Sequence, residues 1–118
     1  MEPPKRLVDA STLTSAQVES LSSHLYVLAH EMTLKQAASA RSVGPVRVGS
    51  YFRTIQQGRN NIKSSIMTVV LALLSGFVKG EELRRLLNQV GEGFPELGED
   101  EVDRAVSLIE ALVDKIVM

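Results

Sequence analysis

The sequence has no cysteine, and this absence excludes several classes of protein at once. Disulfide-stapled secreted scaffolds, thiolate metal centres, iron–sulfur clusters and cysteine nucleophiles all require the missing thiol. A chain without cysteine fits a reducing compartment best. We therefore expect a cytoplasmic protein.

Long hydrophobic runs are also missing. The longest apolar run, residues 66–78, is thirteen positions long and is interrupted by Thr68, Ser75 and Gly76, whereas a membrane-spanning helix needs about 20 apolar residues. The charged start of the chain, residues 1–6, is not followed by the apolar core of a signal peptide. We expect neither a membrane segment nor export.

Residue patterns typical of enzymes and metal sites do not occur. His24 and His30 are six positions apart, whereas a zinc-binding pair on a helix is four apart. There is no Gly-Lys-Ser/Thr phosphate loop, and residues 91–93 lack the third glycine and the preceding strand of a dinucleotide fingerprint. A nucleophile, a base and an orienting group cannot be identified together. We predict a non-enzymatic protein with no cofactor and no metal site.

The chain of 118 residues is 44% hydrophobic, which fits one globular domain. Its net charge of −1 hides an uneven distribution. Residues 1–31 carry −2, residues 32–79 have seven basic side chains and no acidic one, and residues 80–118 carry −6. The acid-free stretch predicts a surface that binds a polyanion. The alternative is that the acidic last third folds against this stretch and neutralises it.

The apolar spacing predicts an all-α fold, a small bundle of about four helices with a long central helix. Residues 1–12 predict a flexible N-terminal arm, followed by a single helical domain over residues 13–118. Thr14 and Gln17 have the capping-box spacing that starts a helix over residues 15–40. This helix carries a seam at spacings of three and four, a candidate protein interface formed by Val18, Leu21, Leu25, Leu28 and Met32.

The central helix is predicted over residues 50–76, with Gly49-Ser50 as its N-cap. Within it, Gly58 costs about 1 kcal/mol relative to alanine, which indicates either a close approach by another element or a bend. Helices over residues 80–91 and from residue 99 or 100 onward are expected to fold back on its apolar half. The alternative is an intertwined homodimer, since a second copy could cover the seam and the polar first half of the central helix.

The polar face of the central helix is the best candidate for a binding site. It is rich in arginine, lysine, glutamine and asparagine, whose side chains hydrogen-bond phosphates and base edges. Two arginines that precede the central helix, Arg41 and Arg47, are expected to contact phosphates as well. The candidate nucleic-acid-binding residues are therefore Arg41, Arg47, Arg53, Gln57, Arg59, Asn60 and Lys63.

The expected function is that of a small helical protein that binds DNA or RNA, with DNA favoured, mainly through phosphates. The alternative is a helical protein–protein interaction module, either a homo-oligomer or an accessory subunit of a nucleic-acid-processing assembly. In that case the glutamine and asparagine side chains only solvate the helix or form hydrogen bonds between helices.

Overall fold

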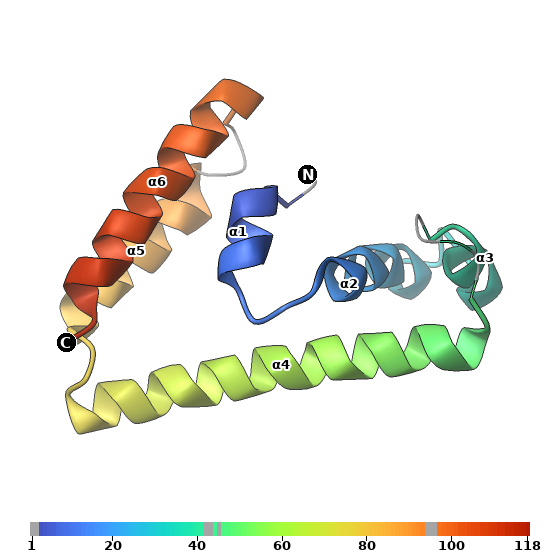
Figure 1. Cartoon of the computed structure of the whole chain (residues 1–118), viewed down its shortest axis with the longest axis horizontal. Coiled ribbons are helices and arrows are strands. Elements are labelled where there is room, and N and C mark those ends of the chain that lie inside the picture. Colours follow the sequence, from blue (N-terminus) through green and yellow to red (C-terminus); the bar gives the residue numbers. More distant parts are fainter. Residues whose placement is uncertain (1–2, 42–43, 45, 94–96) are drawn as a thin grey trace. The chain divides into compact units, whose positions relative to one another are not determined.

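The computed structural model describes residues 3–41, 44, 46–93 and 97–118 (Figure 1). The structure is 78% helical and has no β-strand in these residues, which confirms the predicted all-α class. Among the described residues four helices have seven residues or more, and one of them is the predicted long central helix. In chain order the helices are α1 (Lys5–Ala10), α2 (Ser15–Leu28), α3 (Leu34–Ser39), α4 (Val48–Ser75), α5 (Gly80–Gly93) and α6 (Glu99–Ile116).

The single helix predicted over residues 15–40 is wrong, because two helices occupy this region. α2 begins after the predicted capping box of Thr14 and Gln17, which the structure confirms. It ends because His30 takes a left-handed backbone conformation, with φ of 60°. The His30 and Glu31 amides then donate to two carbonyl oxygens of the last turn, the bonding pattern of a Schellman motif. A second capping box starts α3 at Thr33.

The predicted central helix is confirmed as α4, although its start differs. The helix begins at Val48, so Gly49-Ser50 lies inside the first turn and is not the N-cap. α4 ends in a second Schellman motif, in which Gly76 has a φ of 76° and the Phe77 amide donates to the Ala72 carbonyl oxygen. A left-handed residue is easily supplied by glycine, so the sequence marks this end correctly.

The chain forms two compact units, and α4 contributes to both. One unit consists of residues 8–64, and its core is a cluster of four buried side chains from α3 and α4. Five partly buried apolar side chains pack against that cluster. The core residues are Ala37, Ala38, Tyr51 and Ile55, and the packed residues are Leu21, Val27, Met32, Leu34 and Val46.

The other unit consists of residues 1–7 and 65–118, in which α5 and α6 lie side by side (Figure 1). Leu86, Val106 and Ile116 are its buried apolar residues. An antiparallel bridge joins Val78, just before α5, to Val117, just after α6. The predicted packing of these two helices on the apolar half of α4 is wrong, since every large apolar side chain of α4 beyond position 65 is at least 40% exposed.

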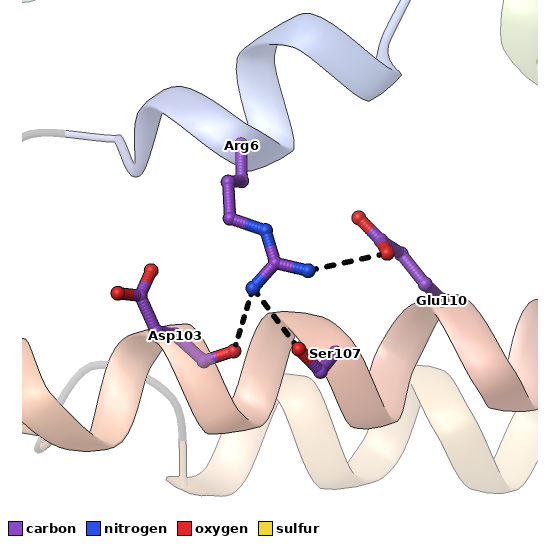
Figure 2. Close-up of polar contacts among 4 residues, drawn as sticks. All are labelled: Arg6, Asp103, Ser107 and Glu110. Atoms are coloured by element: carbon purple, nitrogen blue, oxygen red, sulfur yellow. Dashed lines mark hydrogen bonds and ion pairs between the residues drawn. The ribbon is translucent and has the colours of Figure 1, made fainter.

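The predicted N-terminal arm contains α1, which is six residues long. The Arg6 guanidinium on α1 donates hydrogen bonds to the Asp103 carbonyl oxygen and to Ser107 Oγ of α6 (Figure 2). It also forms an ion pair of 3.3 Å with Glu110 Oε2. The division into a flexible arm and one helical domain over residues 13–118 stays a prediction.

Candidate nucleic-acid interface

The first half of α4 is oriented by the side chains that it buries. Tyr51 is fully buried, and its hydroxyl donates a hydrogen bond of 3.0 Å to the Ser20 carbonyl oxygen of α2. One turn later, Ile55 is only 2% exposed. A Cβ atom placed on Gly58 would lie 2.8 Å from Leu21 Cδ1, so the predicted close approach at this glycine is confirmed. These contacts direct the opposite side of α4 toward solvent.

Asn61 strengthens this orientation from the edge of the buried face. Its amide nitrogen donates to the Thr12 carbonyl oxygen at 3.3 Å and to Gln17 Oε1 at 3.1 Å. Gln17 also accepts from the Thr14 amide in the capping box, so one glutamine joins the start of α2 to α4. Asn61, which is part of the polar run of the central helix, therefore has a packing role.

The exposed side of α4 carries a shallow polar hollow of about 210 Å³, lined by Gln56, Arg59, Asn60 and Lys63. Their spacing of three and four residues places them on one face of the helix. No lining residue is acidic. The structure therefore brings together three of the predicted residues, which we name with Gln56 as the α4 basic face.

The remaining predicted residues of α4 are exposed but do not line the hollow. Arg53 is exposed and precedes Gln56 by one turn, so it extends the α4 basic face toward the start of the helix. Gln57 is exposed but is absent from the lining of the hollow, which Gln56 provides instead. Arg47, just before α4, is also exposed.

Arg41 has different surroundings from the other predicted cations. It is half-buried, and its Nε atom is buried without a hydrogen-bond partner among the described residues. Burial raises the pKa of the Tyr51 hydroxyl above its ordinary value of 10.0, and the positive charge of Arg41 opposes this increase. Arg41 therefore lies close enough to the core to act on Tyr51, and its assignment as a phosphate contact stays a prediction.

The charge of the two units differs in sign. Residues 8–64 contain six basic and three acidic residues, whereas residues 1–7 and 65–118 contain seven basic and eleven acidic residues. The α4 basic face thus belongs to a unit with a net charge of +3. Local potential of this kind governs contacts with polyanions more than the net charge of the chain does.

The predicted protein interface on the first helix is divided by the structure. Leu21 and Met32 pack against the core of residues 8–64, and Val18 is half-buried. Leu25 and Leu28 are 67% and 64% exposed. Because α2 ends at Leu28, Met32 does not continue the same helical seam.

Comparison with known protein families, with curated proteins and with solved structures finds no match to this chain. Among the described residues, no group of three or more histidine and acidic side chains is arranged to hold a metal ion. No helix in the described ranges has the length and apolar character needed to cross a bilayer. The surfaces of the two units are therefore the features that bear on function.

Proposed function

We propose that the protein binds nucleic acid, DNA in the first instance, through the α4 basic face. The observation that carries this proposal is the hollow in which two cations and two amides, and no acid, meet on one exposed helix face. The net charge of +3 on residues 8–64 supports it. Both features favour the binding of a polyanion. When basic side chains of the protein neutralise its phosphates, the counterions that were held there are released.

The four side chains have complementary roles toward a phosphate backbone. The Arg59 guanidinium can donate two parallel hydrogen bonds to one phosphate, while the Lys63 ammonium acts as a compact charge. Amides such as Asn60 can donate to phosphate or sugar oxygens, or bond a base edge in the major groove. Most of the affinity should come from the phosphates, so we expect weak sequence preference and strong dependence on salt.

Fluorescence anisotropy with labelled duplex and single-stranded DNA tests this proposal. With about four neutralised phosphates, affinity for duplex should fall about 100-fold between 50 and 200 mM salt. The double variant Arg53→Glu/Lys63→Glu should abolish binding or reduce the salt slope by about 2. Both positions are exposed, so the fold should tolerate the changes.

The matched control is Arg84→Glu/Arg104→Glu, which makes the same change in net charge at two exposed positions outside residues 8–64. It should bind DNA nearly as well as the unmodified chain. Absence of any binding at about 50 mM salt, where phosphate contacts are strongest, would reject the proposal. Equal loss in both double variants would reject the α4 basic face as the site.

A second candidate function, a helical protein–protein interaction module, is favoured by a different observation. The second half of α4 exposes a continuous set of large apolar side chains. Soluble proteins rarely expose apolar patches larger than a few hundred Å² unless the patch binds a partner. The two functions use different residues and are compatible in one chain.

A further inference from the structure

The second half of α4 contains a segment that is both exposed and free of charge. No charged residue occurs between Lys63 and Lys79. The apolar segment, as we call residues 66–74, has seven large apolar side chains that are between 40% and 84% exposed. They are Ile66, Met67, Val69, Val70, Leu71, Leu73 and Leu74.

The distribution of these side chains is unusual for a surface helix. A solvent-exposed helix normally has one apolar stripe and a polar opposite face, whereas a helix that is apolar around most of its circumference is buried. At 3.6 residues per turn, the seven side chains surround more than half of the helix. The apolar segment thus has the composition of a buried helix, although its large apolar side chains are exposed.

The exposed area is in the range of a weak interface. Seven aliphatic side chains at about half exposure leave on the order of 500 Å² of apolar surface per chain. Two such surfaces together offer at most roughly 1,000 Å², about the lower limit for a specific interface, so we expect a weak pair that depends on protein concentration. No charge within the segment would have to be desolvated when it is covered, so the usual penalty for burying ions does not arise.

We propose that a second copy of this chain covers the apolar segment, with the two α4 helices packed antiparallel. The orientation follows from charge on either side of the segment. Arg59 and Lys63 precede it, within a unit that carries +3, whereas residues 80–118, which follow it, have a net charge of −6. Antiparallel pairing places the basic first half of each α4 toward the acidic residues 80–118 of the other copy, and parallel pairing would place like charges together.

A closed twofold pair also explains how the segment avoids further association. In an antiparallel pair each copy presents the same residues to the other, so the interface is self-complementary and stops at two chains. This proposal goes beyond nucleic-acid binding, because residues 66–74 form the interface, whereas Arg59 and Lys63 of the α4 basic face contribute only the charge that sets its orientation. The failure of one proposal therefore leaves the other standing.

Light scattering after size-exclusion chromatography, over protein concentrations from about 1 to 100 μM, tests the pairing. The full chain should have twice its monomer mass of 12.9 kDa at the upper concentrations. Leu74→Glu should give a monomer, because Leu74 is 84% exposed and its replacement disturbs only an intermolecular contact. Leu25→Glu is the matched control, since Leu25 is 67% exposed on α2, and it should remain a dimer.

Circular dichroism should show unchanged helix content for Leu74→Glu, and anisotropy should show that this variant still binds DNA where the unmodified chain does. A monomeric full chain at every concentration would overturn the proposal, as would a dimer that survives Leu74→Glu. A dimer that Leu25→Glu also dissociates would overturn the assignment to the apolar segment.

The absence of cysteine makes the orientation measurable with a single introduced thiol. Ser50→Cys, at an exposed position near the start of α4, can carry a spin label. In an antiparallel pair centred on Val70, the two labels should be on the order of 60 Å apart, since each lies 20 residues from the centre at 1.5 Å per residue. A separation near 10 Å would show parallel pairing and overturn the proposed orientation.

Discussion

The first half of α4, up to residue 64, and its second half form one continuous helix (Figure 1) but differ in charge and in the exposure of their side chains. The first half is polar over most of its surface, yet it buries Tyr51, Ile55 and Gly58. The second half is almost entirely apolar, yet its large side chains are at least 40% exposed. Hydrophobicity along this helix therefore does not determine burial.

What differs between the halves is the presence of a fitted neighbour. α2 approaches the first half closely because a glycine at position 58 leaves room for Leu21. The Tyr51 hydroxyl and the Asn61 amide then bond to α2 and to the segment before it. The large apolar side chains of the second half stay at least 40% exposed, which is why we assign their cover to another copy of the chain.

The largest expected effect compares the same substitution in the two halves. Ile55→Ala removes a side chain that is 2% exposed and should lower the free energy of unfolding by about 2 to 5 kcal/mol. Ile66→Ala removes one that is 58% exposed and should cost less than about 0.5 kcal/mol in the monomer. Urea unfolding followed by circular dichroism measures both.

A cost for Ile66→Ala as large as that for Ile55→Ala, at a concentration where the chain is monomeric, would contradict the comparison. Tyrosine fluorescence gives a separate reading of residues 8–64, because both tyrosines, Tyr26 and Tyr51, lie there and the chain has no tryptophan. A cost for Ile66→Ala that grows with protein concentration would instead indicate a loss of dimer stability.

A smaller effect is expected where α2 approaches α4. Gly58→Leu forces a side chain toward Leu21, and overpacking of this kind should destabilise residues 8–64 by about 1 to 3 kcal/mol. Gly49→Leu is the control, since a Cβ atom at Gly49 meets nothing within 4 Å in the same helix. Thermal unfolding should show a lower Tm for Gly58→Leu alone. Equal effects at both glycines would mean that α2 is not packed against position 58.

Removal of the hydrogen bond of the Tyr51 hydroxyl should lower the free energy of unfolding by about 1 kcal/mol. Tyr51→Phe removes the donor to the Ser20 carbonyl oxygen, while that oxygen keeps its place in the α2 ladder. Tyr26→Phe, at a position that is 54% exposed, should change the free energy of unfolding by less than about 0.5 kcal/mol. Urea titrations at pH 7 compare the two variants.

Tyr51 also predicts a dependence on alkaline pH. Burial raises the pKa of Tyr51 in the folded state above 10.0, so the folded state holds the proton more tightly than the unfolded state. This contribution to stability is complete below pH 10 and should be lost as the pH rises through the folded pKa. The loss should be smaller in Tyr51→Phe than in Tyr26→Phe. Identical pH profiles would show that Tyr51 is not buried as described.

The smallest effect is expected at the contact between α1 and α6. Arg6 and Glu110 are 44% and 49% exposed in their side chains, and exposed ion pairs contribute between about 0 and 1 kcal/mol. Arg6→Ala should therefore lower stability by less than about 1 kcal/mol, and by less still at high salt. Thermal unfolding at about 50 mM and 1 M salt measures this. A larger, salt-independent loss would indicate that Arg6 stabilises the unit through packing.

Local signals in the sequence predicted most of the helices, and the division of residues 15–40 into two helices was missed although its signals are local as well. Thr14 and Gln17 predicted the start of α2, because residues of these types three positions apart form a capping box. Thr33 and Gln36 have the same spacing and could have predicted α3, but the predicted helix extends past the end of the seam at Met32 to residue 40. His30 does not predict the end of α2, because the left-handed position after a helix is usually occupied by glycine or asparagine.

The candidate site was predictable to the extent that helical spacing determines it. Counting positions of three, four and seven from Gln56 selects the residues that line the hollow, whereas Gln57 belongs to a neighbouring line on the same helix. The packing role of Asn61 follows from where α2 lies against α4, and Arg41 lies close enough to the core to act on Tyr51. Spacing along one helix cannot predict such contacts between helices.

The central claim is that the two halves of α4 have separate roles, and amide chemical shifts measured during a DNA titration test it most directly. At about 50 mM salt, duplex DNA should shift the signals of Arg53, Gln56, Arg59, Asn60 and Lys63. The signals of the apolar segment, residues 66–74, should remain in place. Shifts that are confined to the apolar segment or to α5 and α6, or no shifts at all, would contradict the account.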